Sequence, residues 1–131
     1  MKRKPTDSTD DRRQLLKWRL LVITGAAVIF VGSSIPGDSM PALRILTQDK
    51  LMHLLEYGVF GLLLANWGRL EFTSSSRVWI VLVVAALFAL SDEFHQLLVG
   101  RSCEFYDWLA DMVGVSLALG FTSLYYRRRG K

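Results

Sequence analysis

Cysteine is nearly absent from this sequence of 131 residues, which has one, at position 103. A single thiol excludes a disulfide framework within one chain and any metal site built from cysteines alone. Nucleophile motifs are missing as well, because Ser33, Ser34 and Ser91 do not have the G-x-S-x-G context. Cys103 is expected to be a free thiol in a loop, and nucleophilic catalysis is not indicated.

Charge is absent from two long stretches, residues 20–32 and 78–90. A small transporter needs polar groups along a path through the membrane, so a pathway within a single copy is disfavoured, although an oligomer could form one. The sequence is 51% apolar with a mean hydropathy of +0.28, which indicates a membrane protein. The net charge of +4 does not indicate nucleic-acid binding, because the basic residues lie at the ends of apolar runs rather than on one face of a soluble module.

The apolar runs predict an all-α, integral membrane four-helix bundle. The expected helices are at about residues 15–32, 51–68, 78–98 and 108–126. They form a transmembrane domain at 20–126, between a basic, partly disordered lead-in at 1–19 and a basic tail at 127–131, and a short helix lying on the membrane surface is expected at about 38–46. A cleaved signal peptide is the alternative for the first run, but the three later spans favour a retained helix.

The distribution of basic residues predicts the orientation. Seven Lys and Arg precede the first span, two lie in the loop at 69–77 and four follow Tyr126, whereas three occur in the other two loops together with the ends of the adjoining helices. Because cytoplasmic segments carry the excess of Lys and Arg, both termini are expected inside the bacterial cytoplasmic membrane. Most acidic residues then belong to the outer side.

The stretch from Ser91 to Gly114 is rich in ionisable groups although apolar segments flank it. In the predicted topology, the end of the third span meets the starts of the second and fourth at the outer face. An extracytoplasmic polar pocket is therefore expected there. Its predicted members are Asp49, Lys50, His53, Tyr57, Asp92, Glu93, Gln96, Arg101, Asp107 and Asp111.

Several kinds of chemistry fit this set. A carboxyl group beside a histidine can donate or take a proton, so Glu93, His95, His53 and Asp92 are the candidate acid and base groups. The binding candidates are Asp49, Lys50, Tyr57, Gln96, Arg101, Asp107 and Asp111. His53-x-x-Glu56 and Asp92-x-x-His95 have metal-ligand spacing on a helix, but this signal is weak and no metal is expected.

A purely structural network is the alternative, in which interhelical ion pairs fix the bundle and loop acids such as Glu104 are solvated. Arg101, which follows the turn at Gly100, could bind Asp107 or Glu93 with its planar fork. Six acids near the site exceed the two available cations. The excess requires protonated carboxyl groups, a bound cation or an open, watery cleft.

The ordered motifs resemble the VanZ-like family of small bacterial membrane proteins. The matching segments are SIPG at 34–37, DKLMHLLEY at 49–57, DEFHQ at 92–96, GR at 100–101 and DWLADMVG at 107–114. Two positions depart from the family pattern, because Asp111 stands where asparagine is frequent and Ala118 where glycine is usual. The resemblance implies a multipass protein of the cytoplasmic membrane, and the namesake is associated with low-level resistance to teicoplanin.

Three functions are compatible with these observations. The first is a VanZ-like protein that binds or modifies an outer-leaflet component, such as a lipid-linked cell-wall component, and so changes glycopeptide susceptibility. The second is a membrane enzyme that acts on a lipid or lipid-linked substrate by acid/base chemistry. The third is a structural or assembly subunit of a membrane complex. The sequence identifies no cofactor.

Overall fold

The computed structural model describes residues 8–36 and 46–130, and the surface helix expected at about 38–46 falls almost entirely outside them. It contains four helices: α1 (Ser8–Ser33), α2 (Leu46–Glu71), α3 (Ser74–Leu98) and α4 (Phe105–Arg128). The described residues include no strand, which confirms the predicted all-α class. The helices are longer than the apolar runs, and residues 8–19 are helical where a partly disordered lead-in was expected.

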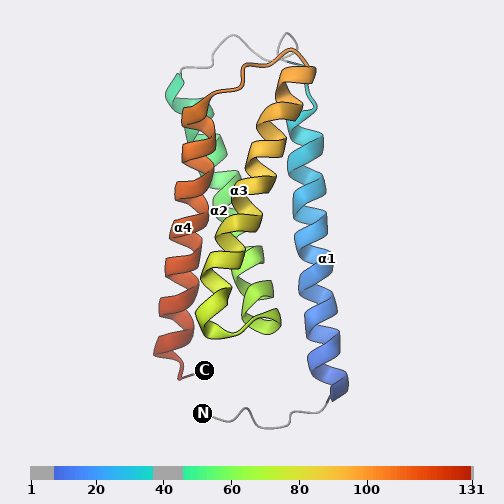
Figure 1. Ribbon diagram of the computed structural model, residues 1–131, viewed down its shortest axis with the longest axis vertical. Coiled ribbons are helices and arrows are strands. Elements are labelled where there is room, and N and C mark those ends of the chain that lie inside the picture. Colours follow the sequence, from blue (N-terminus) through green and yellow to red (C-terminus); the bar gives the residue numbers. More distant parts are fainter. Residues whose placement is uncertain (1–7, 37–45, 131) are drawn as a thin grey trace.

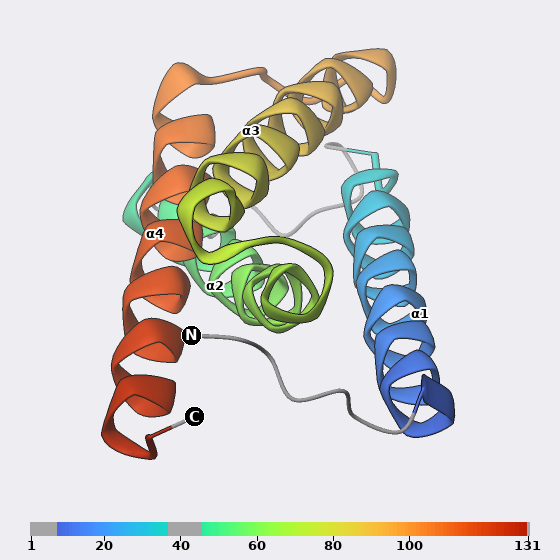
Figure 2. The same cartoon turned by 60° about the horizontal axis from the view of Figure 1, so that its bottom comes forward.

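The helices alternate in direction along the bundle (Figure 1). The C-terminal ends of α1 and α3 therefore share one end with the N-terminal ends of α2 and α4. Helix α2 packs against the other three, whereas the backbones of α1 and α4 do not approach each other closely in the described part of the chain. Figure 2 shows α1 and α4 on opposite sides of α2. The bundle is thus built around α2 and has an open side.

Three of the described helices, α1, α3 and α4, are long and apolar enough to cross a membrane. Four spans were expected. Helix α2 has 26 residues, a span's length, but polar and charged residues from Asp49 to Glu56 interrupt its apolar character. Its most buried apolar side chains are Tyr57, Phe60 and Leu64, and they face the other helices. Packing within the bundle therefore offsets the lower hydropathy of α2.

Helices α2 and α4 approach closely because small residues line their interface. A Cβ atom added to Gly114 would overlap the Leu54 carbonyl oxygen and would lie 2.8 Å from the Gly58 nitrogen. A Cβ atom added to Gly61 would lie 2.9 Å from the Ala118 Cβ. Gly114 and Ala118 are four residues apart on α4 and form a small-xxx-small pair, a pattern that lets two helices approach closely. This interface fixes the depth of α4 against α2, and so the relative heights of their polar side chains.

An ion pair joins α1 to α2 at the end of the bundle where α1 begins. The Arg19 guanidinium donates to both carboxylate oxygens of Glu71 at 2.6–3.0 Å, and the Trp67 Nε1 donates to Glu71 Oε2 at 3.1 Å. A cavity of about 760 Å³ lies at the same end, between α1 and α4. The candidate site described below lies at the opposite end of the bundle, where α1 ends.

Candidate functional site

Buried polar side chains gather where α1 and α3 end and α2 and α4 begin. We call this set the polar cluster: Asp49, Lys50, His53, Tyr57, Asp92, Glu93, Gln96, Arg101, Glu104, Asp107 and Asp111. Seven of its members expose 5% of their surface or less although they carry charged or polar groups, namely His53, Tyr57, Asp92, Glu93, Gln96, Asp107 and Asp111. All ten residues predicted for the pocket lie at this end of the bundle. Burial of so many ionisable groups requires specific partners.

Lys50 neutralises the outer acids of the cluster. Its Nζ donates to Asp107 Oδ1 at 2.8 Å and to Glu104 Oε2 at 3.0 Å. The bond from Lys50 lowers the pKa of Glu104. The structural alternative treated Glu104 as a solvated loop acid, whereas it bonds to Lys50 and is a member of the network. Nothing in its local sequence indicates this role, because it lies in a loop.

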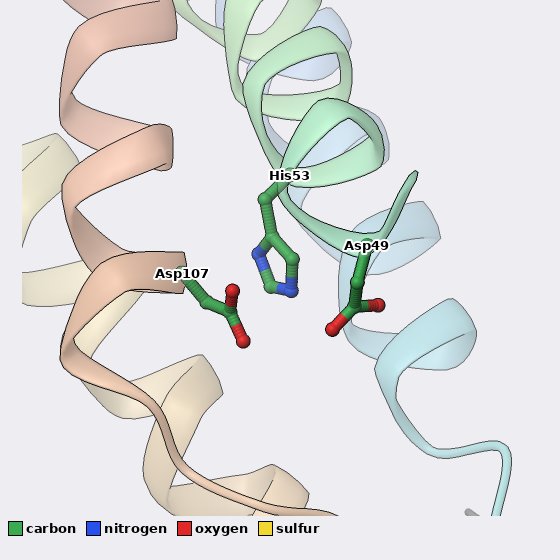
Figure 3. A group of neighbouring side chains, drawn as sticks. All are labelled: Asp49, His53 and Asp107. Carbon is green, nitrogen blue, oxygen red and sulfur yellow. The ribbon is translucent and has the colours of Figure 1, made fainter. Parts of the chain in front are cut away.

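His53 projects from α2 between two acids, Asp49 of the same helix and Asp107 of α4 (Figure 3). Its Nδ1 lies 2.9 Å from Asp111 Oδ1, one turn further along α4. The imidazole therefore lies between two parts of the cluster. One is its partly exposed edge, which we call the rim, where the Asp49 side chain is 20% exposed. The other is its buried part around Asp111, which we call the interior. The placement of His53 beside acids of α4 follows from the topology, as predicted.

Asp92 is held by neutral groups. Ser33 at the end of α1 donates to its Oδ1 at 2.5 Å, and Gln96 donates to its Oδ2 at 3.4 Å. The pair with Gln96 has the helical spacing expected for one face of α3. Ser33 was not among the predicted site residues, and only the placement of α1 against α3 shows its role.

Glu93 is buried in the interior of the cluster. Its Oε2 accepts a hydrogen bond from the Glu104 backbone nitrogen at 3.1 Å, whereas its Oε1 has no hydrogen-bond partner among the described residues. The Asp111 Oδ2 and the Tyr57 hydroxyl are buried and without hydrogen-bond partners in the same sense. Buried oxygens without hydrogen-bond partners are costly unless something binds them.

Arg101 closes the cluster from the α3–α4 loop. Gly100 adopts a φ of 75°, which favours glycine, and the Arg101 backbone nitrogen then donates to the Gln96 carbonyl oxygen at 3.0 Å. The guanidinium lies 3.8 Å from Asp49 Oδ1. Asp107 and Glu93 had been considered as its partners, but among the described residues its ion pair is with Asp49, and Lys50 pairs with Asp107.

His95 of α3 contacts residues of α1. The His95 Nε2 lies 2.8 Å from the Ser34 hydroxyl, and its ring stacks on Phe30 with centroids 4.0 Å apart. Glu56 is exposed on α2. The groups of described residues that could hold a metal ion include neither Glu56 nor His95, and His53 is the histidine of the polar cluster.

Two groups of three side chains in this region could hold a metal ion. They are Asp49, His53 and Asp107 at the rim, and His53, Glu93 and Asp111 in the interior. Within each group, one ligand atom per residue lies within 4.8 Å of the others. The same carboxylates and imidazole could exchange protons, so the arrangement supports either cation binding or acid/base chemistry.

Comparison with known proteins identifies the family. The profile described as VanZ/LLP1 matches residues 14–126, which is most of the chain. The chain belongs to the VanZ/LLP1 family. The matched range of this VanZ/LLP1 protein includes the whole polar cluster. Searches of curated proteins and of solved structures find no match.

Proposed function

We propose that this VanZ/LLP1 protein acts at the envelope of a bacterium, where its polar cluster binds the polar headgroup of an outer-leaflet lipid or lipid-linked cell-wall component. Binding of this kind is expected to lower susceptibility to glycopeptides such as teicoplanin. The proposal rests on the family match and on the concentration of buried polar groups at one end of a membrane bundle.

One observation carries the proposal, which is that the cations of the cluster lie at its rim. The Lys50 side chain is 30% exposed, and its partner Glu104 belongs to a loop and is 35% exposed. The Arg101 side chain is less exposed, at 10%, and its guanidinium lies 3.8 Å from Asp49 Oδ1. An anionic headgroup could therefore replace Glu104 at Lys50 and engage Arg101 without disturbing the buried acids. Phosphate and carboxylate headgroups have this chemistry.

The proposal requires the polar cluster to face the extracytoplasmic side, with both termini in the cytoplasm. This orientation follows from the distribution of Lys and Arg. A reporter fused after Arg129 should be active in the cytoplasm, and a cysteine reagent that does not cross membranes should label Cys103, which is exposed beside the cluster. Extracytoplasmic activity of the reporter would contradict the proposed site.

Teicoplanin susceptibility of a Gram-positive host tests the function. Wild-type protein should raise the inhibitory concentration, whereas Arg101→Ala and Asp107→Asn should abolish the increase at equal membrane levels. Ser91→Ala is the matched control, because Ser91 is exposed on α3 and bonds only to the carbonyl oxygen of Phe88 in its own helix. If the wild type gives no protection, or if all variants protect equally, the proposal fails.

An enzymatic function is the second candidate. It is favoured by Glu93 Oε1, which has no hydrogen-bond partner among the described residues and belongs to the interior group of His53, Glu93 and Asp111. General acid/base catalysis contributes about 10²–10⁴-fold to a rate. Glu93→Gln should then abolish turnover of a labelled lipid extract while headgroup binding remains, and Arg101→Ala should weaken binding first. If the wild type and Glu93→Gln bind the headgroup equally and the wild type shows no turnover, the binding role is favoured. A structural subunit would tolerate both substitutions.

A further inference from the structure

The acids of the polar cluster outnumber its cations. The cluster has six acids, Asp49, Asp92, Glu93, Glu104, Asp107 and Asp111, and two permanent cations, Lys50 and Arg101. Both cations are used at the rim, by Asp107, Glu104 and Asp49. The buried carboxylates of Glu93 and Asp111 are left with His53, which is charged only when protonated. Charge compensation is therefore missing in the interior rather than at the rim.

We propose that His53, Glu93 and Asp111 bind one divalent transition-metal ion, with Zn²⁺ and Mn²⁺ as the ions that suit one imidazole and two carboxylates. The three side chains come from α2, α3 and α4, and all are at least nine-tenths buried. Their ligand atoms lie within 4.8 Å of one another, and metal–ligand distances of about 2 Å require only small side-chain movements to close the site.

The unpaired oxygens supply the second argument for this site. Glu93 Oε1 and Asp111 Oδ2 are buried without hydrogen-bond partners among the described residues. A metal ion would satisfy both atoms and would offset the excess negative charge. The Tyr57 hydroxyl, also buried and unpaired, could donate to a ligand carboxylate or to a water on the ion.

The rim group of Asp49, His53 and Asp107 is less suited to hold the ion, although it shares His53 with the interior group. Lys50 lies 2.8 Å from Asp107 Oδ1, so an ion held by Asp49, His53 and Asp107 would face an ammonium group. Asp49 is partly exposed, however, and His53 belongs to both groups (Figure 3). The rim group therefore provides an entry path from solvent to the interior site.

Metal binding by the purified full-length protein tests the proposal. Strep-tagged protein in detergent is stripped with a chelator and titrated with Zn²⁺, Mn²⁺ and the spectroscopic probe Co²⁺, and bound metal is counted by mass spectrometry. The wild type should bind one ion per chain, with a visible Co²⁺ band. His53→Gln and Asp111→Asn should each weaken binding by about 100-fold or more, since loss of second-shell partners alone costs about 10–100-fold.

The other histidine provides the matched control. His95→Gln should bind as the wild type does, because His95 contacts Ser34 and Phe30 instead of the interior acids. Glu93→Gln should weaken binding and Asp49→Asn should not, which separates the interior site from the rim. No binding by the wild type, or equal loss in His95→Gln, overturns the proposal. Metal binding is measured independently of drug susceptibility. The metal-site proposal and the proposed function can therefore fail separately.

A different feature, the cavity at the opposite end of the bundle, carries a second inference. Each helix contributes one arginine to its lining, Arg12, Arg69, Arg77 and Arg127, whereas Asp11 is its one acidic lining residue. Arg69 lies over the Tyr126 ring at 3.8 Å, and its Nε is buried without a hydrogen-bond partner among the described residues. We infer that this cavity of about 760 Å³ binds a phosphate-bearing anion.

Two sources of phosphate are compatible with this chemistry, the headgroup of an anionic lipid and a free phosphate. The melting temperature of the full-length protein is compared in nanodiscs of phosphatidylcholine alone, with added phosphatidylglycerol, and with inorganic phosphate in solution. Stabilisation by phosphatidylglycerol alone identifies a headgroup, and stabilisation by inorganic phosphate identifies a soluble anion. Stabilisation by neither overturns the inference.

The contribution of the cavity arginines is separated from general attraction by a matched variant. Arg69→Gln and Arg77→Gln should each remove most of the stabilisation. Arg13→Gln should retain it, because Arg13 is exposed on α1 and does not line the cavity. Arg12→Gln, at an exposed position in the lining, keeps the test available if the other two variants fold poorly. Equal losses in Arg13→Gln and the lining variants would contradict a built site.

Discussion

Gly114→Ala should be among the most destabilising single-methyl changes in this protein. The added Cβ would overlap the Leu54 carbonyl oxygen and lie 2.8 Å from the Gly58 nitrogen, and backbone atoms of a neighbouring helix cannot rotate away. Overpacking typically costs 1–3 kcal/mol, so we expect about 3 kcal/mol or more here. Denaturant unfolding in mixed micelles would measure the loss of unfolding free energy.

Gly120→Ala is the matched control on the same helix. No atom lies within 4 Å of the Cβ position at Gly120, and the residue is exposed. Because alanine favours a helix over glycine by about 1 kcal/mol, this substitution should be neutral or slightly stabilising. Equal stability of the two variants would show that α2 and α4 are not in close contact at Gly114.

Lys50→Met should have the largest effect of any change in the polar cluster. It leaves Asp107, whose side chain is 2% exposed, without its ammonium partner. Breaking a buried ion pair costs 3–5 kcal/mol, and we expect about 3 kcal/mol because Lys50 itself is partly exposed. The same unfolding measurement applies, and ligand binding at the rim should be lost as well.

The double variant Lys50→Met with Asp107→Asn distinguishes an unpaired charge from a loss of packing. It should recover most of the stability, since no buried carboxylate is left uncompensated at that position. Arg19→Met, which breaks an exposed interhelical pair with Glu71, should change stability little. Failure of the double variant to recover would mean that the Lys50 stem, rather than its charge, supports the bundle.

The arrangement of the helices was predictable from the sequence because it follows from few constraints. Apolar runs set the number of helices, and short loops made neighbours antiparallel. The ends that carry His53, Glu93 and Asp111 had to meet for that reason alone. The alternating directions of the helices were therefore sufficient to predict which helix ends carry the candidate site.

The partners within the site were not predictable, because they depend on how each helix is rotated about its axis. Glu56 and Glu93 are both acids near helix ends, yet one is exposed and the other is 1% exposed. Contact at Gly58 and Gly114 sets the rotation of α2 and α4, and the α3–α4 loop places Glu104 at Lys50. Such tertiary contacts decide that Lys50, rather than Arg101, pairs with Asp107.

The open side of the bundle between α1 and α4 leaves apolar side chains for the surrounding lipid to cover. Between α1 and α4, apolar side chains such as Leu62, Leu63 and Phe121 line a groove over α2. Side chains of α1, including Ile23 and Val28, are largely exposed. In a bilayer, fatty-acyl chains complete this wall, so the choice of detergent should decide how firmly α1 stays attached. A short-chain detergent is expected to release α1 while α2, α3 and α4 remain together.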